Sequence, residues 1–211
     1  MSPTSTHSTQ QQRRGYWLRT LHQWHWISAA VCLVGMLLFS ITGITLNHAA
    51  QIEGKPEVTT VHDTVPATLL KTLPARGDGK APLPVGLRGW LRDKHGIVPG
   101  DREAECSEDE LYLSMPGPGN DAWLSIQRAD GALEYERTDR GTLAWLNDLH
   151  KGRNAGTAWS WFIDVFAVAC IVFTATGLFL LYLHGRQRRA TWPLVALGLL
   201  IPMLLALLFI H

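Results

Sequence analysis

Apolar residues are concentrated in three long stretches, at 26–46, 159–183 and 192–210, and polar residues fill the intervals between them. Each stretch reaches the roughly 20 residues that an α-helix needs to cross a hydrocarbon core of about 30 Å. The first and third stretches contain no charged residue, and the second contains only Asp164. The pattern therefore predicts three transmembrane helices.

The interval between the first two stretches has the shorter patterns of a small folded domain. Residues 67–73 and 87–95 are typical of helices, and residues 110–114 alternate as a strand does. Residues 122–127 and 132–137 flank an Arg-Ala-Asp-Gly turn and predict a β-hairpin. Residues 142–149 predict a short amphipathic helix, and the polar residues 1–12 predict a disordered tail.

The predicted fold is membrane α-helical, with three transmembrane helices and a small α+β domain inserted between the first and the second. The predicted segments are a tail at 1–19, transmembrane helix 1 at 20–48, the inserted domain at 49–140, an interfacial helix and loop at 141–157, transmembrane helix 2 at 158–184, a loop at 185–191 and transmembrane helix 3 at 192–211.

Arginines predict the orientation of these helices. Residues 13–19 contain three arginines before the first helix, and residues 186–189 contain three more between the second and third. Lys and Arg are in excess in cytoplasmic loops, so the N-terminus is predicted to be cytoplasmic. Residues 49–157 would then face the periplasm of a bacterium whose inner membrane holds the chain. The net charge of +1 gives no indication of a nucleic-acid partner.

Histidines lie at or near the ends of the first two predicted helices. Ionisable side chains at membrane depth are costly and tend to be functional, and neutral imidazole is a common axial ligand of haem iron. An interfacial role, with the ring solvated by headgroups or water, is the alternative for each. The candidate ligands are His22, His25, His48, His150 and His184.

Spacing decides how these histidines can pair. His25 and His48 are 23 residues apart, or ~34 Å along a straight helix, so they cannot share one haem. The predicted pairs are His48 with His150 on the outer side, and His184 with either His25 or His22 on the inner side. Bis-imidazole ligation favours electron transfer. The chain has no CxxCH motif, so the expected cofactor is haem b, one or two per chain.

Two glycines share a helix face with these histidines. Gly43 follows His25 by five whole turns, and Gly177 lies within about 20° of His184 around the helix axis. A glycine there leaves room for a flat macrocycle or for close helix contact, and both interpretations stay open.

Three charged residues are candidates to support a haem site. Asp164 is predicted either to accept a hydrogen bond from a ligand histidine or to bond at the interface. Lys151 and Arg153 could bind haem propionates, an anionic iron chelate or lipid phosphates. The remaining folded-region histidines, His62 and His95, and the terminal His211 are predicted to be surface residues.

Cysteines indicate little chemistry by their spacing. Cys32 and Cys170 lie inside apolar stretches and are expected to be small buried residues. Cys106 is alone in the inserted domain, so that domain has no internal disulfide.

Four sequence motifs resemble those of the PepSY-associated transmembrane proteins. They are LHQWHWIS at 21–28, ITGITLNH at 41–48, DLHKGR at 148–153 and ATGLFLLYL at 175–183. The resemblance implies a PepSY-like outer domain, bound haem and reduction of ferric iron or a ferric siderophore. A cytoplasmic or quinol electron donor would supply the electrons. This chain is shorter than the larger members, so a homodimer could complete its haem sites.

Two other functions are compatible with the same sequence. PepSY domains are associated with restraint of peptidases, so the chain could be a membrane-anchored binding module without redox activity. It could also be an accessory subunit of a transporter. Both alternatives predict a protein without haem.

Overall fold

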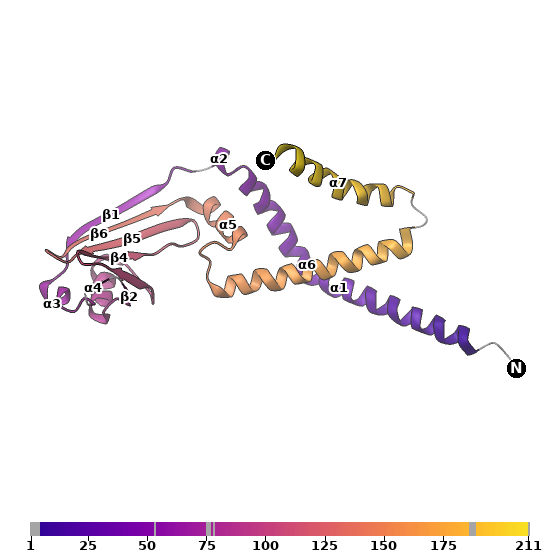
Figure 1. Cartoon of the computed structure of the whole chain (residues 1–211), viewed down its shortest axis with the longest axis horizontal. Helices are drawn as coiled ribbons and strands as arrows, with labels where there is room; N and C mark the ends of the chain where they lie inside the picture. The colour runs from indigo at the N-terminus through magenta and orange to yellow at the C-terminus, as the bar shows by residue number, and fades with distance from the viewer. Residues whose placement is uncertain (1–4, 53, 75–76, 78, 186–188, 211) are drawn as a thin grey trace. The chain divides into compact units, whose positions relative to one another are not determined.

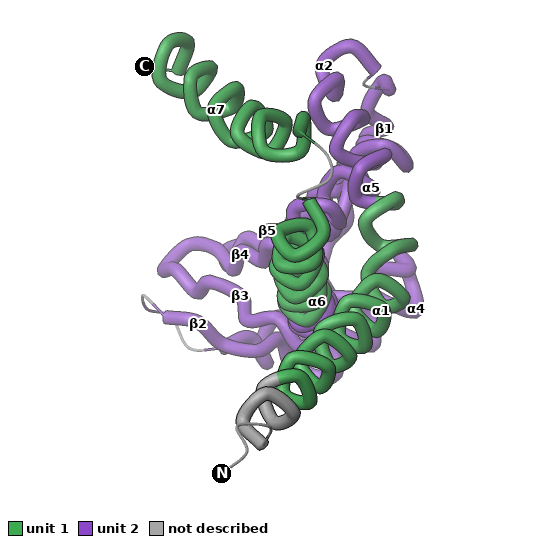
Figure 2. The backbone as a smooth tube through the Cα atoms, turned by 90° about the vertical axis from the view of Figure 1, so that its right-hand side faces the viewer, with its two compact units in different colours: residues 1–38, 163–211 green, residues 39–162 purple. Residues whose placement is uncertain are grey.

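The computed structural model describes the chain except residues 1–4, 53, 75–76, 78, 186–188 and 211. The predictions for Arg186, Arg188 and His211 therefore lie outside the described residues. The chain divides into two compact units (Figure 2). Unit 1 is Met1–Leu38 with Ile163–His211, and unit 2 is Phe39–Phe162.

Three helices in the described residues are long and apolar enough to cross a membrane, as the hydropathy pattern predicts. They are α1 (Ser5–Asn47), α6 (Thr157–His184) and α7 (Thr191–Phe209). No residue of α6 or α7 is fully buried by protein. Apolar side chains exposed in this way are stable in lipid, so the chain is a membrane protein.

Helix α1 begins at Ser5, far earlier than the predicted membrane helix, and the prediction of disorder for residues 1–12 is wrong there. Residues 5–14 contain neither Pro nor Gly. Gln and Arg have high helix propensity. Extension of an existing helix needs no new nucleation, so a modest propensity is enough to prolong α1 toward the N-terminus.

Between α1 and α6 in the sequence, unit 2 contains a six-stranded antiparallel sheet with the order β1-β6-β5-β4-β3-β2 (Figure 1). The strands are β1 (Glu57–Thr64), β2 (Gly79–Pro82), β3 (Glu103–Cys106), β4 (Glu110–Ser114), β5 (Asn120–Gln127) and β6 (Ala132–Asp139). The helices of this unit are α2 (Ala49–Ile52), α3 (Ala67–Leu70), α4 (Val85–His95) and α5 (Gly141–Lys151).

The structure confirms the predicted strand at 110–114, the hairpin of β5 and β6, and the helices α4 and α5. Helix α3 is shorter than the predicted 67–73. Sequence patterns missed β1, β2 and β3. Strand β1 is exposed along most of its length and β2 has only four residues. Pairing with neighbouring strands therefore decides their conformation.

The core of unit 2 lies between one face of the sheet and helix α4 (Figure 1). Alternate residues of the central strands point into it, as the period of two requires. Helix α4 contributes Leu87 and Leu91 from successive turns, and both are fully buried. Cys106 is buried in the same core.

A charged cluster joins the end of α4 to the edge strand β1. The Asp63 carboxylate pairs with Lys94 Nζ at 2.6 Å and with His95 Nε2 at 2.7 Å. The His95 side chain is only 13% exposed, so the prediction of an ordinary surface histidine is wrong for it, whereas His62 is exposed as predicted. The hydrogen bond from Lys94, and then that from the Thr64 backbone N–H, lower the pKa of Asp63 from 3.8 to about 2.

The lowered pKa predicts acid sensitivity of unit 2. A carboxyl group whose pKa is lower in the folded state stabilises the fold above its ordinary pKa of 3.8, and that stabilisation is lost as the pH falls toward about 2. We expect the free energy of unfolding of the wild type to decrease across this window, and Asp63→Asn to lack this part of the decrease. Denaturant titrations at a series of pH values measure it. Asp101→Asn, at a fully exposed carboxylate, is the control and should titrate like the wild type.

Candidate functional site

His150, on α5, packs against the end of α1 within unit 2. Its Nδ1 lies 2.7 Å from the Thr42 hydroxyl oxygen. Its ring is 5.0 Å from the ring of Phe39. Its Cε1 lies 3.6 Å from the position that a Cβ on Gly43 would occupy. The ring therefore fills the space that Gly43 leaves on α1.

The sheet holds α5 in this position through Asp148, which is buried. One Asp148 carboxylate oxygen accepts the Gly119 backbone N–H at 2.9 Å and lies 3.5 Å from Arg140. Gly119 has a φ of +67°, and a Cβ there would lie 2.6 Å from the Trp145 backbone nitrogen. Only glycine permits this close approach of the β5 turn to α5.

A second polar contact ties α5 to α1. The Thr45 hydroxyl donates to the buried Asn147 side chain at 3.0 Å. The short helix α5 is thus attached on two sides. Asp148 binds the sheet, whereas Asn147 and His150 bind α1.

His25 makes the corresponding contact in unit 1. Its Nδ1 lies 3.0 Å from the Thr176 hydroxyl oxygen of α6 and 3.2 Å from the Phe173 carbonyl oxygen. The ring stacks on Phe173 with 4.7 Å between ring centres. Its Cε1 lies 3.1 Å from the position of a Cβ on Gly177.

The two contacts have the same composition: in each, a histidine ring lies on a Thr-Gly pair of another helix. Sequence reasoning placed Gly43 and Gly177 on the faces of predicted ligands but did not find that a histidine from elsewhere covers each. The recurrence of Thr-Gly at 42–43 and 176–177 was the signal for it. The space beside Gly43 is thus occupied by the His150 ring, and the space beside Gly177 by the His25 ring.

Hydrogen bonding fixes the tautomer of the His25 ring. The Phe173 carbonyl oxygen beside its Nδ1 can only accept, so the His25 Nδ1 carries the proton. The Nδ1 of His150 shares a hydrogen bond with the Thr42 hydroxyl, which can donate as well as accept. In the part of the chain that the structure describes, Nε2 of neither ring has a hydrogen-bond partner.

The remaining three candidate ligands have the same tautomer as His25. Each donates Nδ1–H to the carbonyl oxygen four residues earlier: His22 to Leu18 at 2.8 Å, His48 to Ile44 at 3.0 Å and His184 to Leu180 at 3.0 Å. A carbonyl can only accept, so Nε2 again carries the lone pair. Metal-bound histidines usually donate their other ring N–H in this way.

His22 and His184 lie together in unit 1. Their ring centres are 6.1 Å apart, with the planes nearly perpendicular at 79°. His22 sits at the start of the apolar part of α1 and His184 at the end of α6. The structure therefore brings together one of the two predicted inner pairs, with His22 in place of His25. At the outer end, His48 is exposed, and the described contacts do not join it to His150.

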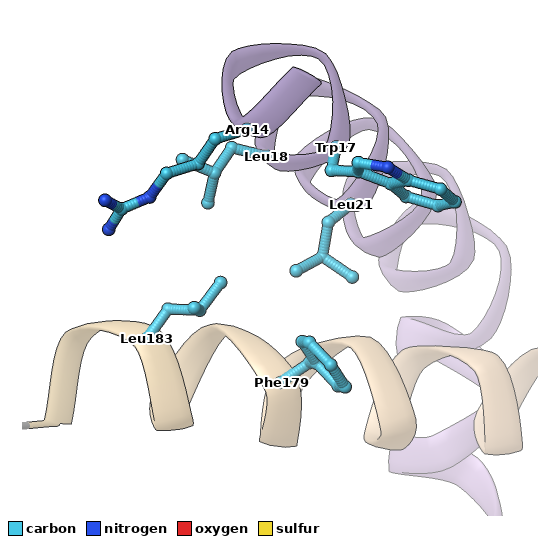
Figure 3. Close-up of a pocket in the computed structure, with 6 residues that line it drawn as sticks. All are labelled: Arg14, Trp17, Leu18, Leu21, Phe179 and Leu183. Atoms are coloured by element: carbon cyan, nitrogen blue, oxygen red, sulfur yellow. The ribbon is translucent and has the colours of Figure 1, made fainter. Parts of the chain in front are cut away.

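A cavity of about 430 Å³ lies between the same two helices in unit 1, and neither His22 nor His184 is among the residues that line it (Figure 3). Leu183 and Phe179 project from α6 toward α1, and Arg14 is the cation at its edge (Figure 3). Leu18, whose carbonyl holds His22, contributes to the wall from α1. The walls of the cavity are otherwise formed by Trp17 and Leu21.

The three charged candidates, Asp164, Lys151 and Arg153, have side chains that are largely exposed. Asp164 is exposed on α6 and makes no hydrogen bond or ion pair within the described ranges. Lys151 pairs with Asp148 at 3.6 Å, and the Arg153 side chain is exposed. Among the described residues, no group of three or more His, Cys, Asp or Glu side chains is placed to hold a metal ion.

These features define a class of protein: three membrane-spanning helices, an antiparallel sheet unit between the first two, and histidines with free Nε2 atoms on the helices. A family model described as PepSY_TM-like matches residues 16–211, and the chain belongs to that family. No curated protein matches the chain. No solved structure matches it either.

The His150–Thr42 contact predicts a measurable contribution to stability. Thr42→Val keeps the shape of the side chain but removes the oxygen that hydrogen-bonds to His150 Nδ1. A hydrogen bond of this kind contributes about 0.5–1.5 kcal/mol, so we expect a decrease of that size in the free energy of unfolding in mixed micelles. Thr60→Val, at an exposed position of β1, is the matched control. Equal stability of the two variants would contradict the contact.

Proposed function

We propose that this chain is a haem-binding electron-transfer protein of the bacterial inner membrane, which reduces ferric iron or a ferric chelate on the side of the sheet unit. The observation that carries the proposal is the His22–His184 pair. One ring lies at the start of the apolar part of α1 and the other at the end of α6. The ring centres are 6.1 Å apart, and both Nε2 atoms are free within the described residues.

The spacing of this pair fits ligation of one metal atom. A metal–imidazole bond is roughly 2 Å long, so two rings that bind one metal from opposite sides have their centres roughly 6 Å apart. The observed 6.1 Å agrees with this value. In both rings Nδ1 is bonded to a backbone carbonyl oxygen, as it usually is in a histidine that binds a metal through Nε2.

The surroundings of the pair also suit haem. The cavity between the two helices has five apolar lining residues and one cation, Arg14. An apolar wall excludes water from a macrocycle, and a guanidinium binds carboxylates such as propionates. When bound between two imidazoles, haem supplies one-electron transfer without an open position for oxygen chemistry.

The chain's own residues then have separate tasks. The Leu18 and Leu180 carbonyls hold the rings of His22 and His184 in orientation. Arg14 neutralises an acidic substituent at the cavity edge. His25 and His150 join helices through Thr-Gly pairs, and His48, exposed with its Nε2 free within the described residues, is available to a second haem.

We place the N-terminal end of α1 in the cytoplasm and the sheet unit in the periplasm, because residues 13–19 contain three arginines. Under this orientation the His22–His184 pair lies at the cytoplasmic side, where a soluble or quinol donor delivers electrons. The sheet unit meets the ferric substrate on the other side.

Haem content tests the proposed ligands. We expect the purified chain to show a Soret band and sharp reduced α and β bands, with about one haem per chain for the inner pair. His22→Ala and His184→Ala should each lower haem content at least about tenfold, because a neutral methyl cannot ligate iron. Pyridine haemochrome analysis gives the ratio.

The matched control is His62→Ala, which removes an exposed histidine of β1 and should retain full haem content. A wild-type preparation that stays colourless after haem supplementation would sink the proposal. It would favour a binding module or an accessory subunit instead.

Electron transfer across the bilayer is tested in vesicles that carry dithionite inside, with the N-terminus of the chain inward and a ferric chelate outside. We expect ferrous iron to appear outside, detected by a ferrous-specific dye, at a rate that His184→Ala lowers at least tenfold, roughly in proportion to its lost haem. His62→Ala is again the control. Equal rates for the wild type and for vesicles without protein would contradict the reductase function.

A further inference from the structure

Side chains of α1 and α6 meet in unit 1, and their contacts follow an antiparallel order. His25 contacts Thr176, and a Cβ on Gly35 would lie 2.3 Å from the Phe166 ring. In an antiparallel pair of helices, a higher residue number on α1 meets a lower residue number on α6. The two residue numbers of each contact therefore have the same sum, as they do for 25 with 176 and for 35 with 166. Cys32 falls between these contacts, so its expected neighbour on α6 is residue 169 or 170.

The cysteine at position 170 occupies that place. The contacts on either side, His25 with Thr176 and Gly35 with Phe166, therefore place Cys32 and Cys170 on the faces by which α1 and α6 meet. Cys32 is 0% exposed, although most of its neighbours on α1 are exposed. Cys170 is partly buried and, like Cys32, forms no disulfide in this structure.

A covalent bond between these thiols requires a close approach of the two helices. A disulfide requires Cα atoms about 4.4–6.8 Å apart, which is closer than helices with large interface residues usually come. On α1, Ser28 lies one turn before Cys32 and Gly35 one turn after it. Small residues at membrane helix interfaces allow backbones to approach closely.

We propose that Cys32 and Cys170 form a reversible disulfide that joins α1 to α6 inside the membrane. Two S–H bonds break and one S–S bond forms. Two protons are released, and two electrons pass to a two-electron oxidant that dissolves in the bilayer. Thiol reductants reverse the step by thiol–disulfide exchange.

The bond links the two helices that carry His22 and His184. Residue 32 is ten positions from His22 and residue 170 is fourteen from His184, so the disulfide would restrain the sliding of α1 along α6 that separates the two rings. The inference depends only on the packing of α1 against α6, and it stands whether or not the chain binds haem.

The experiment oxidises the full chain in lipid nanodiscs with molecular iodine, which accepts two electrons and leaves as iodide. The chain is then denatured, and free thiols are counted with a maleimide-polyethylene glycol that shifts the band on a gel. The chain has three cysteines, so we expect three labels before oxidation and one after it, on Cys106. Dithiothreitol should restore all three.

Single variants separate this result from other oxidation. Cys32→Ala and Cys170→Ala each leave two cysteines that cannot form this pair, and both should keep two labels after iodine. Intact mass should show the loss of two hydrogen atoms in the wild type alone. The inference is overturned if the oxidised wild type keeps three labels, if either variant loses labels to the same extent, or if a disulfide-linked dimer accounts for the loss.

Discussion

An imidazole among apolar helices must give its N–H to an acceptor that the protein supplies, because lipid offers none. The energetic cost of an unpaired polar group in hydrocarbon is several kcal/mol. All five histidines on or beside the membrane helices meet this constraint through Nδ1, which bonds to a backbone carbonyl or to a threonine hydroxyl. In the four rings whose Nδ1 lies beside a backbone carbonyl oxygen, Nε2 has no hydrogen-bond partner within the described residues. His95 of the sheet unit is the contrast, since its Nε2 is bonded to Asp63.

The same constraint explains the use of Thr-Gly pairs. A Cβ at position 177 would lie 3.1 Å from the His25 ring, which is closer than an ordinary contact, whereas one at position 43 would lie 3.6 Å from the His150 ring. The threonine that precedes each glycine supplies a hydroxyl that hydrogen-bonds to the histidine Nδ1. A histidine can then lie flat on a neighbouring helix without an unpaired donor. His25 uses this arrangement on α6 and His150 uses it on α1. In lipid the hydrophobic effect does not drive helices to associate, so polar contacts of this kind and close packing at small residues hold them together.

Helix α5 connects the sheet to α1 within unit 2. Its buried Asp148 binds the Gly119 turn of the sheet, while Asn147 and His150 bind α1. Neighbouring residues of one short helix therefore make both attachments. A displacement of the turn before β5 would therefore also move the His150 ring relative to Thr42. The sheet is thus mechanically connected to the end of α1 through α5.

Sequence alone determined the three membrane spans, the hairpin of β5 and β6, helix α4 and the set of histidines available as ligands. Those features follow from local pattern, since hydropathy over 20 residues or a period of two is visible without knowledge of any partner. Tertiary structure decided the rest. The exposed strand β1 and the four-residue strand β2 exist because neighbouring strands pair with them. His22 rather than His25 lies beside His184 because α6 packs on α1 in one register, in which Thr176 and Gly177 receive His25. A residue's type and spacing reveal what it is able to bind, whereas the register between two helices, a property of neither helix alone, decides which partner it meets.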